Sequence, residues 1–297
     1  LKFWRDWRVW VRSIKPDAYL VGEVWWEKWP DKLMDPKPYV QGDIFDAVMF
    51  YQIYKPARYF FAATEQKMDA RELKDSLEYH WNRLAPETVQ AMMNVSSSHD
   101  APRLLTDFYN PNRYKYHANR NENTDYRTGK PEKDSFERLR LYLMHLFTIP
   151  GAPQVWNGEE MGMWGADDPH CRKPLTWPGM QFEDEIRYPG SSAGELRYDK
   201  VGFNEAQFAL YKQLIRIRRE NPVLQTGRLE FLHAEGEVLA YRRMQGKDEV
   251  VVVFNLADKP FRYLLPKGSY TDLMSGRNYT SIIRLKSRSG VVLKVNR

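Results

Sequence analysis

The chain has 297 residues, 42% of them hydrophobic and 14% aromatic, which is enough material for one large domain and one small domain. Its net charge of +6 comes from basic residues that are scattered among 39 acidic ones, so we expect no nucleic-acid partner. The sequence holds one cysteine, Cys171, which excludes an internal disulfide, and no run of about eighteen apolar residues, so we predict no membrane span.

The first predicted element is an amphipathic helix over residues 1–14, which has apolar side chains on one side and ends before Pro16. A chain that opens inside such a helix is expected to be a fragment, and any targeting information would lie outside it. The sequence therefore does not predict a compartment, and periplasmic, extracellular and cytoplasmic locations all stay open.

Four short apolar runs are predicted strands, at residues 18–22, 44–50, 91–98 and 152–156. Helices are predicted between and after them, over residues 51–63, 69–84, 134–148 and 204–221. Alternating strands and helices indicate parallel β/α units, and four such units make half of an eightfold barrel. A doubly wound sheet is the competing arrangement, but no Gly-rich phosphate-binding turn follows any of these strands.

The pattern changes at residue 223, where short β-rich runs separated by Gly, Asp, Lys and Pro begin. The predicted fold is therefore α/β, with residues 1–222 as the C-terminal half of a TIM (β/α)8 barrel. Residues 223–297 are predicted to form a small antiparallel β-sandwich domain. No low-complexity linker separates the two parts, so we expect them to pack closely.

Glu23 ends the first predicted strand and is followed by Trp25 and Trp26. These aromatic neighbours are expected to remove the carboxyl group partly from water and to raise its pKa, which is what a general acid requires. The alternative is a solvated Glu that only terminates a strand, and this residue alone does not separate the two interpretations.

The pair His99-Asp100 follows the third predicted strand, two β/α units after Glu23. In a barrel the C-terminal ends of the strands share one rim, so Glu23 and Asp100 are expected on the same rim. An acidic residue there can stabilise positive charge. The alternative is that Asp100 only caps the next helix, because Asp at such positions often does so.

The loop at residues 157–177 gathers side chains that invite a metal-site interpretation: Asp167, Asp168, His170, Cys171 and Arg172. Their spacing matches neither a calcium loop nor a zinc site, and an Asp close to an Arg more often forms an ion pair or binds a polar ligand. We therefore predict no metal here. Glu159 and Glu160, at the start of the loop, are predicted to be solvated.

Three segments carry a family resemblance: PDAYLVGEVW at residues 16–25, NVSSSHDAPR at 94–103, and PGAPQVWNGEEMGMWGADDPHCRKPLTW at 150–177. In this order they resemble the α-amylase superfamily of retaining glycoside hydrolases, and specifically its neopullulanase, cyclomaltodextrinase and maltogenic amylase branch. The resemblance covers almost the whole chain. It implies a catalytic TIM barrel and action on α-1,4-glucans such as maltooligosaccharides, cyclodextrins, pullulan or starch.

The resemblance also implies catalytic roles by position. Glu23 matches the family's general acid/base, and Asp100 matches the aspartate that stabilises the transition state. Taken alone, Glu23 and Asp100 each allow a purely structural interpretation. The surrounding motifs favour a catalytic role for both.

Substrate-binding roles are implied in the same way. His99 matches a neighbour that hydrogen-bonds a sugar hydroxyl, Asp168 and Arg172 match positions at the glycone end of the cleft, and Trp25 matches the aromatic residue that borders the acceptor side. Trp26 departs from the pattern, because many relatives carry a His there.

The largest departure concerns the nucleophile. The family's nucleophilic Asp lies in a Gly-x-Arg-x-Asp motif that would precede Leu1 and does not occur in this sequence. The resemblance therefore implies a double displacement in the intact parent, without a metal or redox cofactor, whereas this chain alone is expected to be inactive. A structural calcium ion would lie mainly in the missing half.

The expected partners are an α-glucan and either the missing N-terminal barrel half or a second copy of the chain, because a half barrel would expose strand edges and an apolar face. Two alternatives stay open: a non-catalytic carbohydrate-binding fragment, and a transglycosylase that uses the same residues.

Overall fold

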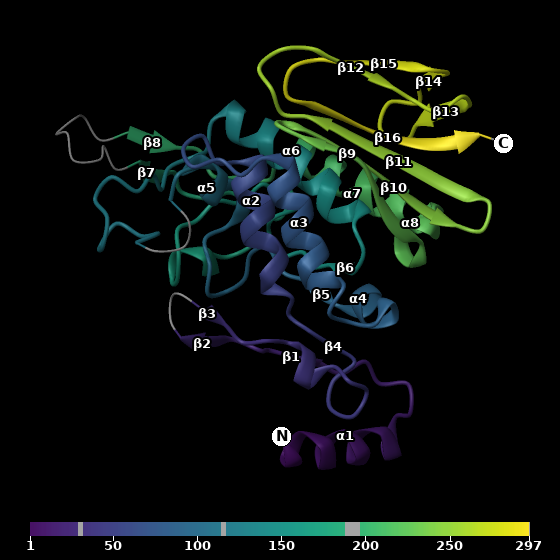
Figure 1. The fold of residues 1–297 in the computed structure, drawn as a ribbon. Helices are drawn as coiled ribbons and strands as arrows, with labels where there is room; N and C mark the ends of the chain where they lie inside the picture. The colour runs from purple at the N-terminus through teal and green to yellow at the C-terminus, as the bar shows by residue number, and fades with distance from the viewer. Residues whose placement is uncertain (29–31, 114–116, 188–196, 297) are drawn as a thin grey trace.

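The computed structural model describes residues 1–28, 32–113, 117–187 and 197–296. Helix α1 (Lys2–Ile14) lies at one end, a β sheet near the C-terminus lies at the other, and the remaining helices and short strands lie between them (Figure 1). Within the described ranges, no helix combines the length and the apolar composition that crossing a bilayer requires.

In the described part of the chain, the four predicted strands appear as parallel pairs of two residues each: β1 (Val21–Gly22), β4 (Ala47–Val48), β5 (Met93–Asn94) and β6 (Ala152–Pro153). A parallel bridge between Met49 and Met93 connects the first pair to the second, so the strands are neighbours in chain order. Neighbouring barrel strands have this order too, but the half-barrel assignment stays a prediction.

The strands are shorter than predicted because side chains satisfy backbone groups beside them. Asp46 Oδ2 accepts a hydrogen bond from the backbone N–H of Leu20 at 2.8 Å. Asn94 Nδ2 donates to the carbonyl of Pro150 at 2.8 Å. Each such bond replaces a ladder bond that would otherwise extend the strand.

The four predicted interior helices are present as α2 (Tyr54–Phe61), α3 (Ala70–Trp81), α6 (Lys133–Thr148) and α7 (Glu205–Glu220). Helix α3 begins with a capping box in which Asp69 and Glu72 each accept a hydrogen bond from the other's backbone N–H.

The 3-10 turn η2 (Tyr51–Ile53) begins the segment that was predicted as a helix over residues 51–63. Several other short elements were not predicted: the helices α4 (Pro86–Ala91), α5 (Leu104–Tyr109) and α8 (Val223–Thr226), and the 3-10 turns η1 (Lys37–Tyr39) and η3 (His170–Arg172). Two antiparallel strand pairs were also not predicted: β2 (Trp26–Lys28) with β3 (Lys32–Leu33), and β7 (Glu185–Arg187) with β8 (Arg197–Asp199). Elements this short do not extend over enough residues to show a hydrophobic period.

The C-terminal part contains an antiparallel sheet of six strands in the order β14-β13-β16-β11-β10-β9. A further antiparallel pair, β12 and β15, shares an apolar cluster with one face of this sheet. The bounds are β9 (Arg228–Glu235), β10 (Val238–Gln245), β11 (Asp248–Asn255), β12 (Phe261–Leu264), β13 (Ser269–Asp272), β14 (Asn278–Tyr279), β15 (Ile282–Leu285) and β16 (Ser289–Asn296). The predicted boundary at residue 222 stays a prediction.

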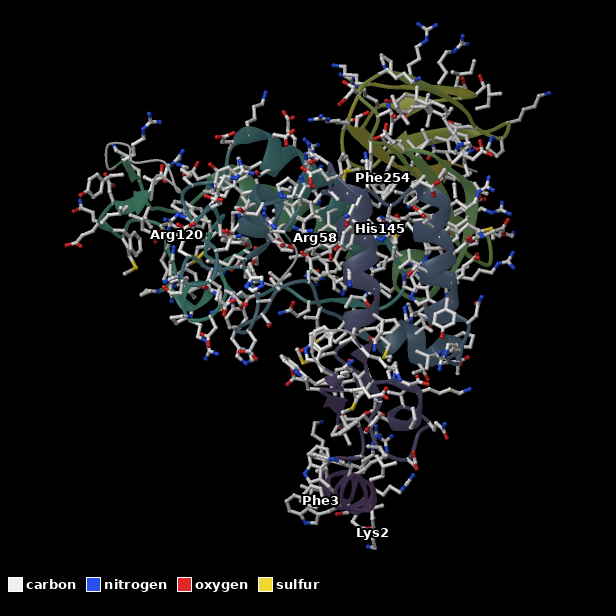
Figure 2. All side chains as sticks on the ribbon, turned by 60° about the vertical axis from the view of Figure 1, so that its left-hand side comes forward. Lys2, Phe3, Arg58, Arg120, His145 and Phe254 are labelled. Carbon is white, nitrogen blue, oxygen red and sulfur yellow. The ribbon has the colours of Figure 1, made fainter. Side chains whose placement is uncertain are left out.

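The other face of the large sheet packs on α6, as expected for two closely packed parts. Ten of the sixteen residues of α6 are buried. Its His145 lies among the rings of Phe61, Tyr241 and Phe254, with His145 and Phe254 close together in Figure 2. The core is therefore continuous from the helices into the sheet.

A buried arginine on β10 adds polar contacts to this interface. The Arg243 side chain donates hydrogen bonds to the carbonyls of Thr148, Leu224 and Gly227 at 2.6 to 3.1 Å. It therefore joins the end of α6 to α8 and to the start of the sheet.

Helix α1 packs by one face only. Trp4 and Trp7 contact the ring of Phe45, and Arg8 and Arg12 bind Asp46 at 2.9 and 2.8 Å. None of the thirteen residues of α1, all of which are described, is buried, and four apolar side chains are largely exposed: Phe3, Val9, Trp10 and Ile14. Figure 2 shows Phe3 at the far end of the molecule from Phe254.

Candidate active site

The two predicted acidic positions follow parallel strands. Glu23 comes directly after β1, and His99-Asp100 comes five residues after the end of β5. Because the carboxyl ends of parallel strands lie at one edge of a sheet, both positions project from the same edge.

Glu23 is exposed, so the predicted partial burial of its carboxyl group is wrong. The aromatic ring expected to cover it packs elsewhere, because Trp25 makes an edge contact with Tyr51 at a centroid distance of 5.8 Å. Tyr51, the first residue of η2, donates its hydroxyl hydrogen bond to Glu23 Oε1 at 2.7 Å. The carboxyl group is therefore oriented by a neighbour while it stays open to solvent.

The other four predicted site residues form one cluster. Arg172 Nη2 lies 3.0 Å from Asp100 Oδ1, and Arg172 Nε lies 2.6 Å from Asp168 Oδ1. His99 Nε2 lies 3.1 Å from Asp100 Oδ2. The structure therefore brings His99, Asp100, Asp168 and Arg172 together from segments about seventy residues apart.

This cluster stays accessible to a ligand. The side chains of Asp100, Asp168, Arg172 and His99 retain 35 to 48% of their exposure. The Arg172 guanidinium lies between two carboxylates and offsets their repulsion, and exposed pairs of this kind contribute little to stability. A polar ligand can therefore exchange with these contacts at small cost.

Cys171 is bonded to the segment that carries the cluster. Its thiol is fully buried and donates to the carbonyl oxygen of His99 at 3.1 Å, as Arg172 Nε also does. Burial, with smaller contributions from Asp167 and Asp168, raises the pKa of the Cys171 thiol to about 11. Across the described residues, no group of three His, Cys, Asp or Glu side chains is arranged to hold a metal ion.

Sequence analysis missed the role of Glu159, which is 1% exposed rather than solvated. Its Oε1 accepts hydrogen bonds from Ser97 Oγ at 3.0 Å and from the backbone N–H of Leu104 at 3.2 Å. It therefore binds both ends of the segment that carries His99 and Asp100. No local sequence feature marks this burial, because the partners of Glu159 lie more than fifty residues away.

Burial raises the pKa of Glu159 to about 7 against the lowering effects of Arg103 and its hydrogen bonds. Arg103 is also 1% exposed, lies 3.9 Å from Glu159 Oε1 and donates to the carbonyl of Asn157 at 3.0 Å. The two strand-end loops are thus joined through buried polar groups.

Tyr51 connects the two parts of the site. Besides its bond to Glu23, it lines a cavity of about 40 Å³ together with Ser96, Ser97 and Ser98, the residues that lead into His99. The Glu23 group and the His99 cluster are therefore parts of one region.

The sequence profile described as alpha amylase, catalytic domain, matches residues 1–227. This chain belongs to the α-amylase family. The predicted family and branch are confirmed, because its relatives are cyclomaltodextrinases, maltogenic amylases and neopullulanases.

A cyclomaltodextrinase of Geobacillus thermopakistaniensis is 28% identical over 286 residues, which are 94% of this chain and 39% of that protein. Neopullulanase 2 of Thermoactinomyces vulgaris is 28% identical over 263 residues, which are 86% of this chain and 35% of that protein. The chain thus spans about two fifths of the length of the curated relatives it matches.

Solved structures agree with this family fold of a TIM barrel and a β domain. A protein from Thermus thermophilus superposes with a TM-score of 0.73 and 27% identity, covering 99% of this chain and 56% of that one. The type III pullulan hydrolase from Thermococcus kodakarensis superposes with a TM-score of 0.70 and 25% identity, covering 98% of this chain and 42% of that one.

Proposed function

We propose that this chain is the part of a retaining α-amylase-type glycosidase that carries the general acid/base, and that the complete enzyme acts on α-1,4-glucans. The observation that carries the proposal is the cluster of His99, Asp100, Asp168 and Arg172 beside a strand-end Glu23. Its occurrence in a chain whose residues 1–227 match an α-amylase catalytic domain supports the same assignment.

Glu23 is the proposed general acid/base. In a double displacement it protonates the leaving glycosidic oxygen while an Asp from outside these 297 residues attacks the anomeric carbon. Water then attacks the glycosyl-enzyme intermediate and gives a proton to Glu23. The hydrogen bond from Tyr51 orients the Glu23 carboxyl group, and its exposure leaves room for the substrate oxygen.

Asp100 is the proposed transition-state stabiliser. Its negative charge offsets the positive charge that develops on the oxocarbenium-like sugar. His99 and Arg172 hold its two oxygens in place and can hydrogen-bond sugar hydroxyls themselves. Asp168 and Arg172 then form the glycone end of the cleft, and Trp25 borders the acceptor side.

We propose that an N-terminal barrel half is the partner that covers α1 and β1, and that residues 1–222 form the other half of this barrel. Two observations support it: the exposed apolar side of α1, and Val21 on β1, which is 39% exposed although it lies in a parallel pair. A covering layer at this position would bury both.

Hydrolysis of a chromogenic maltoside tests this function. The chain is assayed alone and after co-expression with an upstream α-amylase barrel half that carries the Gly-x-Arg-x-Asp motif. We expect activity only in the combined sample, and a loss of at least about a thousandfold in Glu23→Gln. Turnover by the chain alone would refute the need for an external nucleophile.

A non-catalytic carbohydrate-binding role is the second candidate, because the sequence contains no Gly-x-Arg-x-Asp motif. Sugar binding without turnover in the combined sample would favour it. Binding in neither sample would rule out both candidates.

A further inference from the structure

A second, larger cavity lies outside the cluster of His99, Asp100, Asp168 and Arg172, which is called the acidic cluster below. It is a groove of about 1010 Å³ between the β2–β3 hairpin and the helices α2 and α3. Its wall on α3 includes Glu72, Ser76, Tyr79 and His80. Ser76 lies four residues after Glu72, and Tyr79 and His80 lie three and four residues after Ser76, so all four are on one helix face. This face extends over about 12 Å, a length that several linked sugar rings occupy.

Aromatic rings from four elements line this groove: Trp26 on β2, Tyr51 on η2, Tyr59 on α2 and Tyr79 on α3. Tyr79 is 58% exposed, and the other three are partly exposed. Arg83 covers one face of the Tyr79 ring at 5.2 Å, which fixes the ring. Flat, partly exposed rings held by neighbours are suited to stacking on sugar faces.

Three cationic side chains that line the groove are each paired with a carboxylate. Lys32 lies 2.8 Å from Glu27 across the hairpin, and Arg83 binds Asp35. At the other end of the groove, Lys67 binds Glu237. Burial, and to a smaller extent Arg83, lowers the pKa of His80, so this imidazole is neutral at physiological pH. The groove is therefore matched to a neutral ligand rather than to an ion.

Gln52 supplies a polar group in the groove wall. It is 8% exposed, and its Nε2 donates to the carbonyl of Met34 at 3.0 Å. Its Oε1 is buried and accepts no hydrogen bond from any residue that the structure describes. Leaving a buried acceptor without a donor is unfavourable.

We propose that this groove is a second binding site for a neutral α-glucan chain, separate from the acidic cluster. Tyr51 joins the two, because it lines the groove and also binds Glu23. A glucan held in the groove would thus extend toward the proposed acceptor side. The inference rests on the proposed function for its choice of sugar.

Calorimetric titration of the chain with maltoheptaose tests the groove directly. We expect Tyr59→Ala combined with Tyr79→Ala to weaken binding at least about tenfold, because two stacking rings are lost. Tyr198→Ala is the matched control, since Tyr198 is also 58% exposed but lies on β8, and we expect its affinity to equal the wild type. Circular dichroism verifies that each variant is folded.

Two further measurements separate the groove from the acidic cluster. Binding should survive Asp100→Asn and Glu23→Gln, and it should change less than about twofold between roughly 50 and 500 mM salt, because the groove charges are paired. Tyr79→Phe, which keeps the ring, should bind like the wild type.

Equal affinity in the double Tyr variant and the wild type would overturn the inference, as would no binding by the wild type. Binding lost on adding the upstream barrel half would also overturn it, since a protein segment would then occupy the groove. The maltoside assay measures the proposed function separately, because neither Tyr59 nor Tyr79 is one of the proposed catalytic residues.

Discussion

Helices α6 and α1 lie in opposite surroundings although both are amphipathic. Helix α6 is packed between α2 and the six-stranded sheet and buries ten of its sixteen residues. Helix α1 buries none of its thirteen, and Val9 and Ile14 are 72 and 70% exposed. An apolar stripe thus predicts that a helix needs a partner, whereas the partners present decide how much of it is buried.

The two regions also differ in how they use charge. At the α6 interface, Arg243 is fully buried and donates only to carbonyl groups. At α1, Arg8 and Arg12 bind Asp46 near the surface. The first arrangement is costly to disturb because its groups are buried, whereas the second lies near the surface and costs little to disturb.

Removing Arg243 tests the buried interface most strongly. Arg243→Ala should lower the free energy of unfolding by about 3 to 5 kcal/mol, because it leaves three buried carbonyls without donors and opens a cavity. Urea denaturation measures the change. The matched control is the adjacent Arg242→Ala, which loses only partly exposed pairs with Glu230 and Glu249 and should cost less than about 1 kcal/mol. Equal losses would contradict the comparison.

His145 gives the same interface a pH dependence. Burial lowers its pKa from 6.5 to about 3, so the unfolded chain binds the proton first as the pH falls. Stability from this group is therefore present above pH 6.5 and lost toward pH 3, by about 1.4 kcal/mol per pH unit.

The measurement is the slope of unfolding free energy against pH in that window. His145→Phe keeps a ring among Phe61, Tyr241 and Phe254 and should flatten the slope relative to the wild type. The exposed His170→Gln should leave it unchanged, and a flattened slope there would refute the assignment.

Substitutions on the exposed side of α1 should show the smallest effect on stability. Trp10 is 62% exposed, so Trp10→Lys should change the free energy of unfolding by less than about 0.5 kcal/mol while reducing self-association in sedimentation experiments. Trp7→Ala, which removes a ring packed against Phe45, should cost about 1 kcal/mol or more. A large loss in Trp10→Lys would show that the exposed side carries contacts of its own.

The fold was predictable where a pattern extended over several turns or strands. Helices α3, α6 and α7 follow from their apolar spacing, and β10 and β11 follow from their β-rich composition. The lengths of the parallel strands did not, because side chains such as Asp46 compete for the flanking backbone groups. The short hairpins depend on tertiary contacts rather than local preference.

The grouping of His99, Asp100, Asp168 and Arg172 was predictable, because these residues follow strand ends or lie in family motifs. The exposure of Glu23 and the burial of Glu159 were not. Both depend on partners distant in sequence, Tyr51 for the first and Ser97 and Leu104 for the second, and no local rule identifies such partners.

The position of Cys171 makes it a built-in reporter for the site. It is the only thiol in the sequence, it is fully buried, and it is bonded to the carbonyl of His99. A thiol reagent can react with it only when local opening exposes the buried thiol. The rate of labelling therefore measures how often this part of the site opens, and a sugar that bridges the segments carrying His99 and Arg172 should slow the reaction.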